Sequence, residues 1–302
     1  MYDQESKGIS YMAGFFMLIA FTIAALVLAT TLSDWLWMNA TGKSLQTISQ
    51  TGIQEGHKNV YRLVQIITAV VGFLLPAVVT ALLLNRKPLK LLGFTGKFSP
   101  VQVALSFVVL ATALLVATGF SYITTALPFP DNWVAEFDRM EKRYSDQVAA
   151  TLSLHAPSDL FFAIIIMAVL PAIGEEALFR GGLQNFLTRG TGKPWMAIIV
   201  TSILFSLAHF SVYGFLSRVV LGITLGALYY YSGRLWISII AHFANNALLI
   251  VMLYMNLQNG KSVTDMMMES KGNALGLMAI PILVVLFMAF KKRSNPEKTF
   301  TQ

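Results

Sequence analysis

The chain has 302 residues, of which 56% are hydrophobic and only 12% are charged. Soluble domains carry about twice that share of charged residues, so the composition argues against a soluble protein. The absence of cysteine excludes disulfide bonds, thiolate metal sites and thiol nucleophiles. The net charge of +7 lies in short basic clusters beside apolar segments, which is typical of membrane proteins and gives no reason to expect a nucleic-acid partner.

Eight apolar segments meet or approach the length of about 20 residues that crosses a lipid bilayer. They are Gly8–Leu32, Leu63–Leu84, Val101–Leu127, Asp159–Leu187, Pro194–Val212, Phe215–Tyr231, Leu235–Met255 and Ala274–Phe290. The first is too long for a removable signal peptide, and the sixth is short and contains Arg218. We therefore predict an all-α, polytopic membrane protein with about eight transmembrane helices, forming a single membrane domain over residues 1–302.

The placement of lysine and arginine predicts the orientation of these helices. Basic clusters at 86–97, 189–193, 234 and 291–298 fall on one side of the membrane if the N-terminus is cytoplasmic. The lysines and arginines of the opposite side lie mostly in longer loops of mixed charge. We expect a multi-pass protein of the cell membrane with both termini in the cytoplasm.

The connection between the third and fourth segments, residues 128–158, has a helical pattern of its own. Trp133, Phe137, Met140, Tyr144 and Val148 recur at helical spacing, while the charged residues fall mostly on other faces. This pattern predicts an amphipathic helix on the membrane surface. A substrate-gating element is the alternative interpretation.

Two adjacent glutamates, Glu175 and Glu176, end a long apolar run in the fourth segment. A carboxylate in hydrocarbon is costly, so an ionisable residue there is a functional-site hypothesis by default. Glu176 and Arg180 are four residues apart and share a helix face, where the pair can neutralise itself. Glu175 is rotated by about 100° from that face and has no such neighbour. Pro171 and Gly174, just before the glutamates, indicate a kink.

Further polar residues occur in the fifth and seventh segments. Phe205 and His209 are four residues apart, as are His242 and Asn246. At about 1.5 Å per residue, Glu175 and these His and Asn side chains fall roughly 10 to 22 Å from the cytoplasmic end of their helices. This agreement in depth predicts one shared site within a catalytic helix core at residues 159–256.

The residue types in this predicted site are those used for hydrolysis by activated water. A carboxylate and an imidazole can together remove a proton from water, and a His and an Asn can donate hydrogen bonds to a developing oxyanion. The same groups could instead bind a divalent metal such as zinc, with Glu175, His209 and His242 as the expected ligands. Taken singly, each intramembrane His is more often a hydrogen-bonding partner between helices.

Three motifs in this core resemble those of a known family. Glu175-Glu176-x-x-x-Arg180, Phe205-x-x-x-His209 and His242-x-x-x-Asn246 are similar, in order and spacing, to the motifs of the CPBP family. That family includes the type II CAAX prenyl endopeptidases, the Abi proteins and bacteriocin-processing or immunity proteins. The resemblance covers residues 168–249.

The resemblance implies a role for each motif residue. Glu175 with His209 would activate the attacking water, and His242 with Asn246 would stabilise the oxyanion. Glu176, held by Arg180, would order the site. Members of the family are described both as metalloproteases and as glutamate-dependent proteases, so the need for a metal stays open.

From these features we predict an intramembrane endopeptidase with a cytoplasm-facing cavity. It would act, within the lipid bilayer, on membrane-associated protein or peptide substrates, whether prenylated or not. One alternative is a non-catalytic immunity or partner-binding protein on the same scaffold. The other is a proton-coupled transporter that uses Glu175 as its proton site.

Overall fold

The computed structural model describes residues 4–48, 53–96, 99–151, 157–262, 266 and 272–294. All regular elements in this part of the chain are helices, as predicted. The α-helices are α1 (Tyr11–Thr41), α3 (Lys58–Ala69), α4 (Leu75–Leu84), α5 (Pro88–Leu92), α6 (Pro100–Ala126), α7 (Asp131–Thr151), α8 (Pro157–Ala163), α9 (Leu170–Glu176), α10 (Asn185–Thr191), α11 (Pro194–Leu207), α12 (Phe215–Ser232), α13 (Leu235–Gln258) and α15 (Ile280–Lys292). Short 3₁₀ helices are η1 (Leu45–Thr47), η2 (Glu55–His57) and η6 (Ala274–Ala279), and the π-helical stretches are η3 (Val70–Leu74), η4 (Ile164–Val169) and η5 (Ala177–Gln184).

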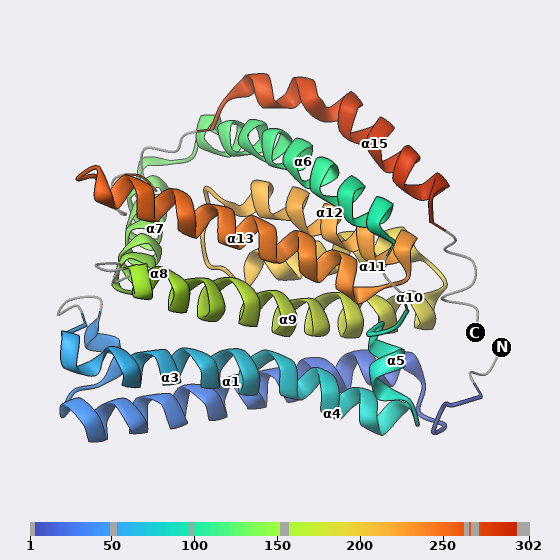
Figure 1. Ribbon diagram of the computed structural model, residues 1–302, viewed down its shortest axis with the longest axis horizontal. Coiled ribbons are helices and arrows are strands. Elements are labelled where there is room, and N and C mark those ends of the chain that lie inside the picture. Colours follow the sequence, from blue (N-terminus) through green and yellow to red (C-terminus); the bar gives the residue numbers. More distant parts are fainter. Residues whose placement is uncertain are drawn as a thin grey trace.

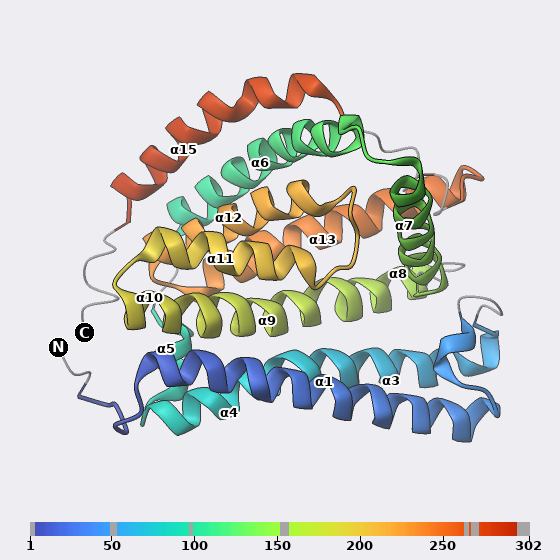
Figure 2. The ribbon, with the colours of Figure 1, turned by 180° about the vertical axis from the view of Figure 1, so that it is seen from behind.

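The long helices lie lengthwise beside one another in layers (Figure 1). Helices α1, α3 and α4 form one layer, and the continuous helix from α8 through η4, α9 and η5 to α10 lies next to it. Beyond that helix come α11, α12 and α13, and then α6 and α15. Helix α5, helix α10 and the end of α15 share one end of the bundle, while α7 lies across the opposite end (Figure 2).

Six helical segments of the described chain are long and apolar enough to cross a membrane. They are Tyr11–Thr41, Lys58–Leu84, Pro100–Ala126, Pro157–Thr191, Leu235–Gln258 and Ala274–Lys292. The other two predicted spans are the helices α11 and α12, with 14 and 18 residues. At about 1.5 Å per residue they fall short of a hydrocarbon core about 30 Å thick. The multi-pass, all-α architecture is therefore confirmed, whereas the count of eight spans stays a prediction.

The outer surface of the bundle is apolar, as a lipid-facing surface must be. Large hydrophobic side chains are exposed along α1, α6 and α15, for example Phe16 at 62%, Leu115 at 58% and Val285 at 63%. A soluble protein rarely exposes such continuous apolar area, because it would associate or precipitate. These faces are consistent with helices that pack against one another on one side and against lipid tails on the other.

Proline shapes two of the long helices. Pro76 in α4 and Pro171 in α9 each follow a π-helical stretch, η3 and η4 respectively. A proline has no N–H to donate to the carbonyl four residues earlier, so the regular α-helical pattern is interrupted there. Stretches of this kind are frequent at functional sites. The kink expected from Pro171 takes this form, and the glutamate pair in α9 lies between η4 and η5.

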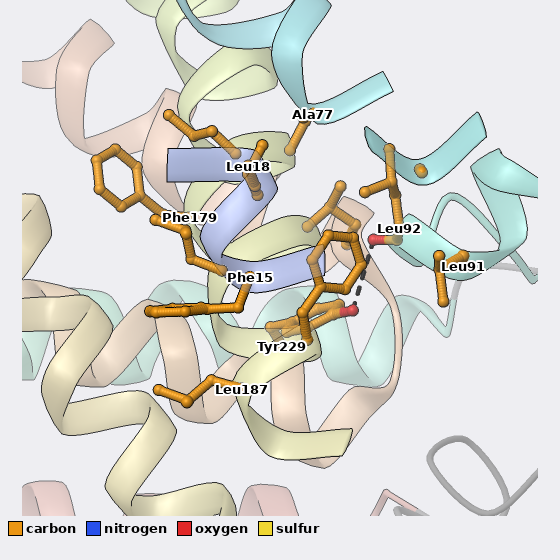
Figure 3. Close-up of a cluster of buried hydrophobic side chains, with 14 of the residues drawn as sticks. Phe15, Leu18, Ala77, Leu91, Leu92, Phe179, Leu187 and Tyr229 are labelled. Atoms are coloured by element: carbon orange, nitrogen blue, oxygen red, sulfur yellow. Dashed lines mark hydrogen bonds between the residues drawn. The ribbon is translucent and has the colours of Figure 1, made fainter. Parts of the chain in front are cut away.

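The largest buried apolar cluster joins the first layer to the glutamate-bearing helix (Figure 3). It includes Leu18 of α1 and Leu92 of α5, both fully buried. The hydroxyl of Tyr229 in α12 donates a hydrogen bond to the carbonyl of Leu92, at 3.5 Å. Gly181 makes this packing possible, because a Cβ there would lie 2.7 Å from the same carbonyl oxygen. The long helix that carries the two glutamates therefore packs, through its segment η5, against α1, α5 and α12.

Candidate active site

The two glutamates of α9 face different surroundings, as their helical spacing predicts. The side chain of Glu176 is fully buried, whereas that of Glu175 is 17% exposed. Adjacent residues on a helix point about 100° apart, so one carboxylate can enter the packed interior while its neighbour faces a cavity. The pair therefore divides into one interior group and one accessible group.

Glu176 makes the predicted ion pair with Arg180. The Oε1 atom of Glu176 accepts a hydrogen bond from Nη1 of Arg180 at 2.6 Å, and both side chains are almost completely buried. The guanidinium also donates from Nη2 to the carbonyl of Gly222, at 3.3 Å. Its Cζ atom lies 4.6 Å from the ring centroid of Phe205. A buried charge needs this many partners, because each one offsets part of its lost hydration.

His242 connects the two glutamates. Its Nδ1 donates a hydrogen bond to Oε1 of Glu176 at 2.8 Å, and its Nε2 lies 3.8 Å from Oε2 of Glu175. Because the carboxylate of Glu176 is held by Arg180 and can only accept, it fixes which imidazole nitrogen carries the proton. The other ring nitrogen of His242, Nε2, consequently faces the carboxylate of Glu175.

His209 has a defined tautomer for a similar reason. Its Nδ1 lies 2.8 Å from the carbonyl oxygen of Phe205, one helical turn earlier. A carbonyl only accepts hydrogen bonds, so Nδ1 is the donor and the Nε2 of a neutral His209 is left as an acceptor. The residue follows the end of α11, and the next one, Phe210, has a left-handed backbone with φ of 50°. His209 is thus positioned where the chain turns sharply out of its helix.

Glu175 and His209 line the same cavity, which has a volume of about 500 Å³. Its other lining residues are Phe73, Met140, Arg143, Tyr144, Phe179, Ala208 and Phe210. The cavity therefore combines one carboxylate and one imidazole with a mainly apolar wall. Such a combination is common in sites that bind and transform a substrate.

Phe205 is the aromatic centre of the site. Its ring centroid lies 4.9 Å from that of His209 and 5.9 Å from that of His242. Together with its position beside Arg180, this makes one buried ring the common neighbour of three polar side chains. The ring of Phe205 therefore packs against the polar groups of the site.

Asn246 occupies a different place from the cavity-lining groups. Its Nδ2 donates to the carbonyl of Met167 at 3.5 Å, and its Oδ1 accepts from Asn245 at 3.0 Å. Met167 precedes Pro171 by four residues, so its carbonyl lacks the α-helical N–H partner it would otherwise have. The oxyanion role of Asn246 stays a prediction.

The expected metal ligands do not converge in this structure. Among the residues that the structure describes, no group of three or more His, Asp or Glu side chains is arranged to hold a metal ion. His242 Nδ1 is already bound to Glu176, and His209 Nδ1 to a backbone carbonyl. These two bonds orient the rings and leave their Nε2 atoms as the ones that a metal could use, as is usual for histidine ligands. The need for a metal, and the roles of Glu175, His209 and His242 as its ligands, therefore stay predictions.

Helix α7 covers the cavity and is docked to the chain beside His209. The hydroxyl of Ser211 donates to Oε2 of Glu141 at 2.8 Å, and the hydroxyl of Tyr213 donates to Oδ1 of Asp138 at 2.8 Å. Burial, followed by the hydrogen bond to Asp138, raises the pKa of Tyr213 to about 12. The predicted amphipathic helix is confirmed, while its contacts with the segment after His209 were not foreseen.

The position of α7 bears on two expectations that were made together, a cytoplasm-facing cavity and cytoplasmic basic clusters. The cavity is lined from α7, which lies at the end of the bundle opposite α5, α10 and the end of α15. Those three elements carry basic clusters that were expected to be cytoplasmic. A cytoplasm-facing cavity and cytoplasmic basic clusters therefore cannot hold together.

Comparison with known proteins bears on the helices that build this site. Residues 157–248 match the family model described as type II CAAX prenyl endopeptidase Rce1-like. This part of the chain is similar to that family. All three motifs lie inside it, and the match confirms the resemblance to the CPBP family. No curated protein and no solved structure matches the chain. An Rce1-like domain in a multi-pass helical protein supports intramembrane endopeptidase activity in general.

Proposed function

We propose that this protein is an intramembrane endopeptidase in which Glu175 and His209 activate the attacking water. The observation that carries the proposal is that these two side chains share one cavity, while Glu176 is withdrawn into a buried ion pair. The Rce1-like match supports the same reaction class and does not favour a non-catalytic scaffold or a proton-coupled transporter.

The reaction requires a water molecule between the Glu175 carboxylate and Nε2 of His209. Both atoms are hydrogen-bond acceptors, so together they orient the water and one of them takes its proton. The remaining hydroxide adds to the carbonyl carbon of the scissile peptide bond. The tetrahedral intermediate then expels the amine, which receives the proton taken earlier, and an acid and an amine are released.

His242 is placed to take this proton over from Glu175 after Glu175 has accepted it from the water. Glu176 holds its Nδ1, and its Nε2 faces Glu175 at 3.8 Å. When His242 carries a second proton on Nε2, it can donate a hydrogen bond to the oxyanion of the intermediate. Glu175, Glu176 and Arg180 together have one excess negative charge, which that proton would balance. Asn246 is the second donor implied by the family motif.

The central test compares membrane peptide profiles of cells that produce the wild-type chain, Glu175→Gln or His209→Ala. Removing a general base lowers the rate by about 10²- to 10⁴-fold, so cleavage products of the wild type should be lost in both variants. Glu5→Gln and His57→Ala are matched controls, because neither residue lines the cavity. If Glu175→Gln cleaves peptides as well as the wild type does, at equal protein level, the proposed mechanism is contradicted.

Two further comparisons define the details of the reaction. Repeating the profile of the wild-type protein with a chelator separates metal-dependent from glutamate-dependent hydrolysis. Presenting the same peptide with and without a prenyl group tests the substrate preference of the family. We propose membrane-associated proteins or peptides as the substrates, because Glu175 and His242 lie within helices that are long and apolar enough to span a bilayer.

A further inference from the structure

The charges of the described residues are unevenly divided between the two ends of the helix bundle. We call the end that holds α5, α10 and the end of α15 the basic end. Its cations lie on α5, α10 and α15 or in the chain next to them: Lys7, Arg86, Lys87, Lys90, Arg189, Lys193, Arg234, Lys291, Lys292 and Arg293. Glu5 is the one acidic residue among the described residues there, and it pairs with Lys87 at 2.5 Å. The basic end thus has a large excess of positive charge.

The opposite end, which we call the α7 end, is close to electrically neutral. Its lysines and arginines are accompanied by about as many acidic side chains. Several are directly paired: Arg62 with Asp159 at 2.7 Å, and Lys142 with Asp146 at 2.9 Å. The positive charges of this end are therefore compensated locally.

This asymmetry indicates which end faces the cytoplasm. Lysine and arginine in short connections are retained on the cytoplasmic side during membrane insertion. The cytoplasmic leaflet also carries anionic lipids, which attract each nearby basic residue by about 1 kcal/mol. Both effects place the basic end in the cytoplasm and the α7 end outside it.

The cavity approaches the surface at the α7 end. Three of its lining residues, Met140, Arg143 and Tyr144, belong to α7. The side chain of Arg143 is 69% exposed, and Phe210 at the same cavity is 75% exposed. A molecule that enters beside α7 therefore has direct access to Glu175 and His209.

We propose that the catalytic cavity opens to the extracytoplasmic side, so that its substrates are peptide segments exposed on that side of the membrane. This proposal rests on the proposed endopeptidase function in one respect, namely that the peptides which enter the cavity are cleaved there. The direction of the opening is independent of catalysis. A peptide that remains in the cytoplasm would be separated from Glu175 by the packed core around the buried Leu92 and Tyr229.

The chain offers a direct test, because it contains no cysteine and single cysteines can be introduced without background. We would express full-length Arg143→Cys and Lys90→Cys in a bacterial inner membrane and add a membrane-impermeant maleimide to spheroplasts. The cysteine at 143 should be labelled in intact spheroplasts, and the cysteine at 90 only after permeabilisation. Labelling of the cysteine at 90 in intact spheroplasts, or of the cysteine at 143 only after permeabilisation, overturns the proposal.

A third variant reports on the cavity itself. Glu175→Cys should react with a small, impermeant methanethiosulfonate added from outside, and reaction only after permeabilisation contradicts the proposed opening. This readout needs no activity, so it separates the two hypotheses. Correct labelling with no peptide cleavage by the wild-type chain rejects the enzyme but not the opening. Cleavage with inverted labelling rejects the opening but not the enzyme.

Discussion

Replacing Arg180 by methionine is the most direct test of how the site is held together. The substitution keeps a long side chain but removes the charge that faces Glu176 at 2.6 Å. Glu176 would then be a buried carboxylate that keeps its hydrogen bond with His242 but has lost its countercharge. Because both members of the ion pair are almost completely buried, solvent cannot screen the charge that is left.

The expected loss follows from that burial. Removing one partner of a buried ion pair costs about 3–5 kcal/mol, most of it from the uncompensated charge. The hydrogen bond to Gly222 and the contact with the Phe205 ring are lost as well, but these terms overlap and do not simply add. We therefore expect Arg180→Met to lower the free energy of unfolding by about 3–5 kcal/mol.

The assay is reversible unfolding in mixed micelles, followed by circular dichroism. A double variant, Arg180→Met with Glu176→Gln, should recover about 2 kcal/mol relative to Arg180→Met alone, because the buried charge is gone. Arg139→Met is the control, since Arg139 pairs with Glu136 on the surface at 68% exposure. It should change stability by less than about 1 kcal/mol. A similarly small loss in Arg180→Met would refute the reasoning.

Three further predictions concern packing and the docking of α7. Phe205→Ala should cost about 3–5 kcal/mol in the same unfolding assay, because the ring packs against three polar groups; a loss below about 1 kcal/mol contradicts this. Gly181→Ala should cost about 1–3 kcal/mol, since its Cβ would lie 2.7 Å from the carbonyl oxygen of Leu92 in the neighbouring helix α5, whereas Gly56→Ala meets nothing within 4 Å and serves as the control. In an alkaline absorbance titration, Tyr213→Phe should remove a tyrosine with a pKa of about 12. Because the pKa of Tyr213 is raised in the folded state, the stabilisation by this contact is fully present below the ordinary tyrosine pKa of about 10. It is lost as the pH rises through about 12. An unchanged titration curve in Tyr213→Phe, or the same curve in Asp138→Asn as in the wild type, argues against the docking contact.

The spacing of residues along one helix predicts contacts within that helix. Glu176 and Arg180, four residues apart, do form the expected pair. Agreement in depth was also enough to predict that side chains from separate helices meet, and Glu175 and His209 do share a cavity. Both deductions rest on the fixed rise and rotation of an α-helix.

Helical spacing and depth do not predict which side chains from different helices form hydrogen bonds with each other. The bond from His242 to Glu176 depends on how two helices are rotated about their own axes, which the one-dimensional pattern does not specify. The π-helical stretches η4 and η5 change that rotation locally. For the same reason, Asn246 could be placed at the right depth but not against the right neighbour, since it faces Met167.

The amphipathic helix shows the same limit. The periodicity of its apolar residues predicted α7 itself, and the bounds Asp131–Thr151 agree with the expected 128–158 segment. The partners of α7 come from the loop after α11, where the hydroxyls of Ser211 and Tyr213 donate hydrogen bonds to carboxylates of α7. No sequence pattern marks that loop, because a single hydroxyl has many alternative uses in a short turn.

The two π-helical stretches around α9 have an evolutionary consequence. A wide turn of this type holds one residue more than an α-helical turn, so it is equivalent to a single-residue insertion that the helix has absorbed. Relative to an uninterrupted α-helix of the same sequence, each such wide turn rotates every later side chain by about 100°. A wide turn can therefore direct a carboxylate toward an interior cavity, and away from lipid, without any change in the residues beyond it. An apolar membrane helix needs very little sequence change to acquire a reactive face.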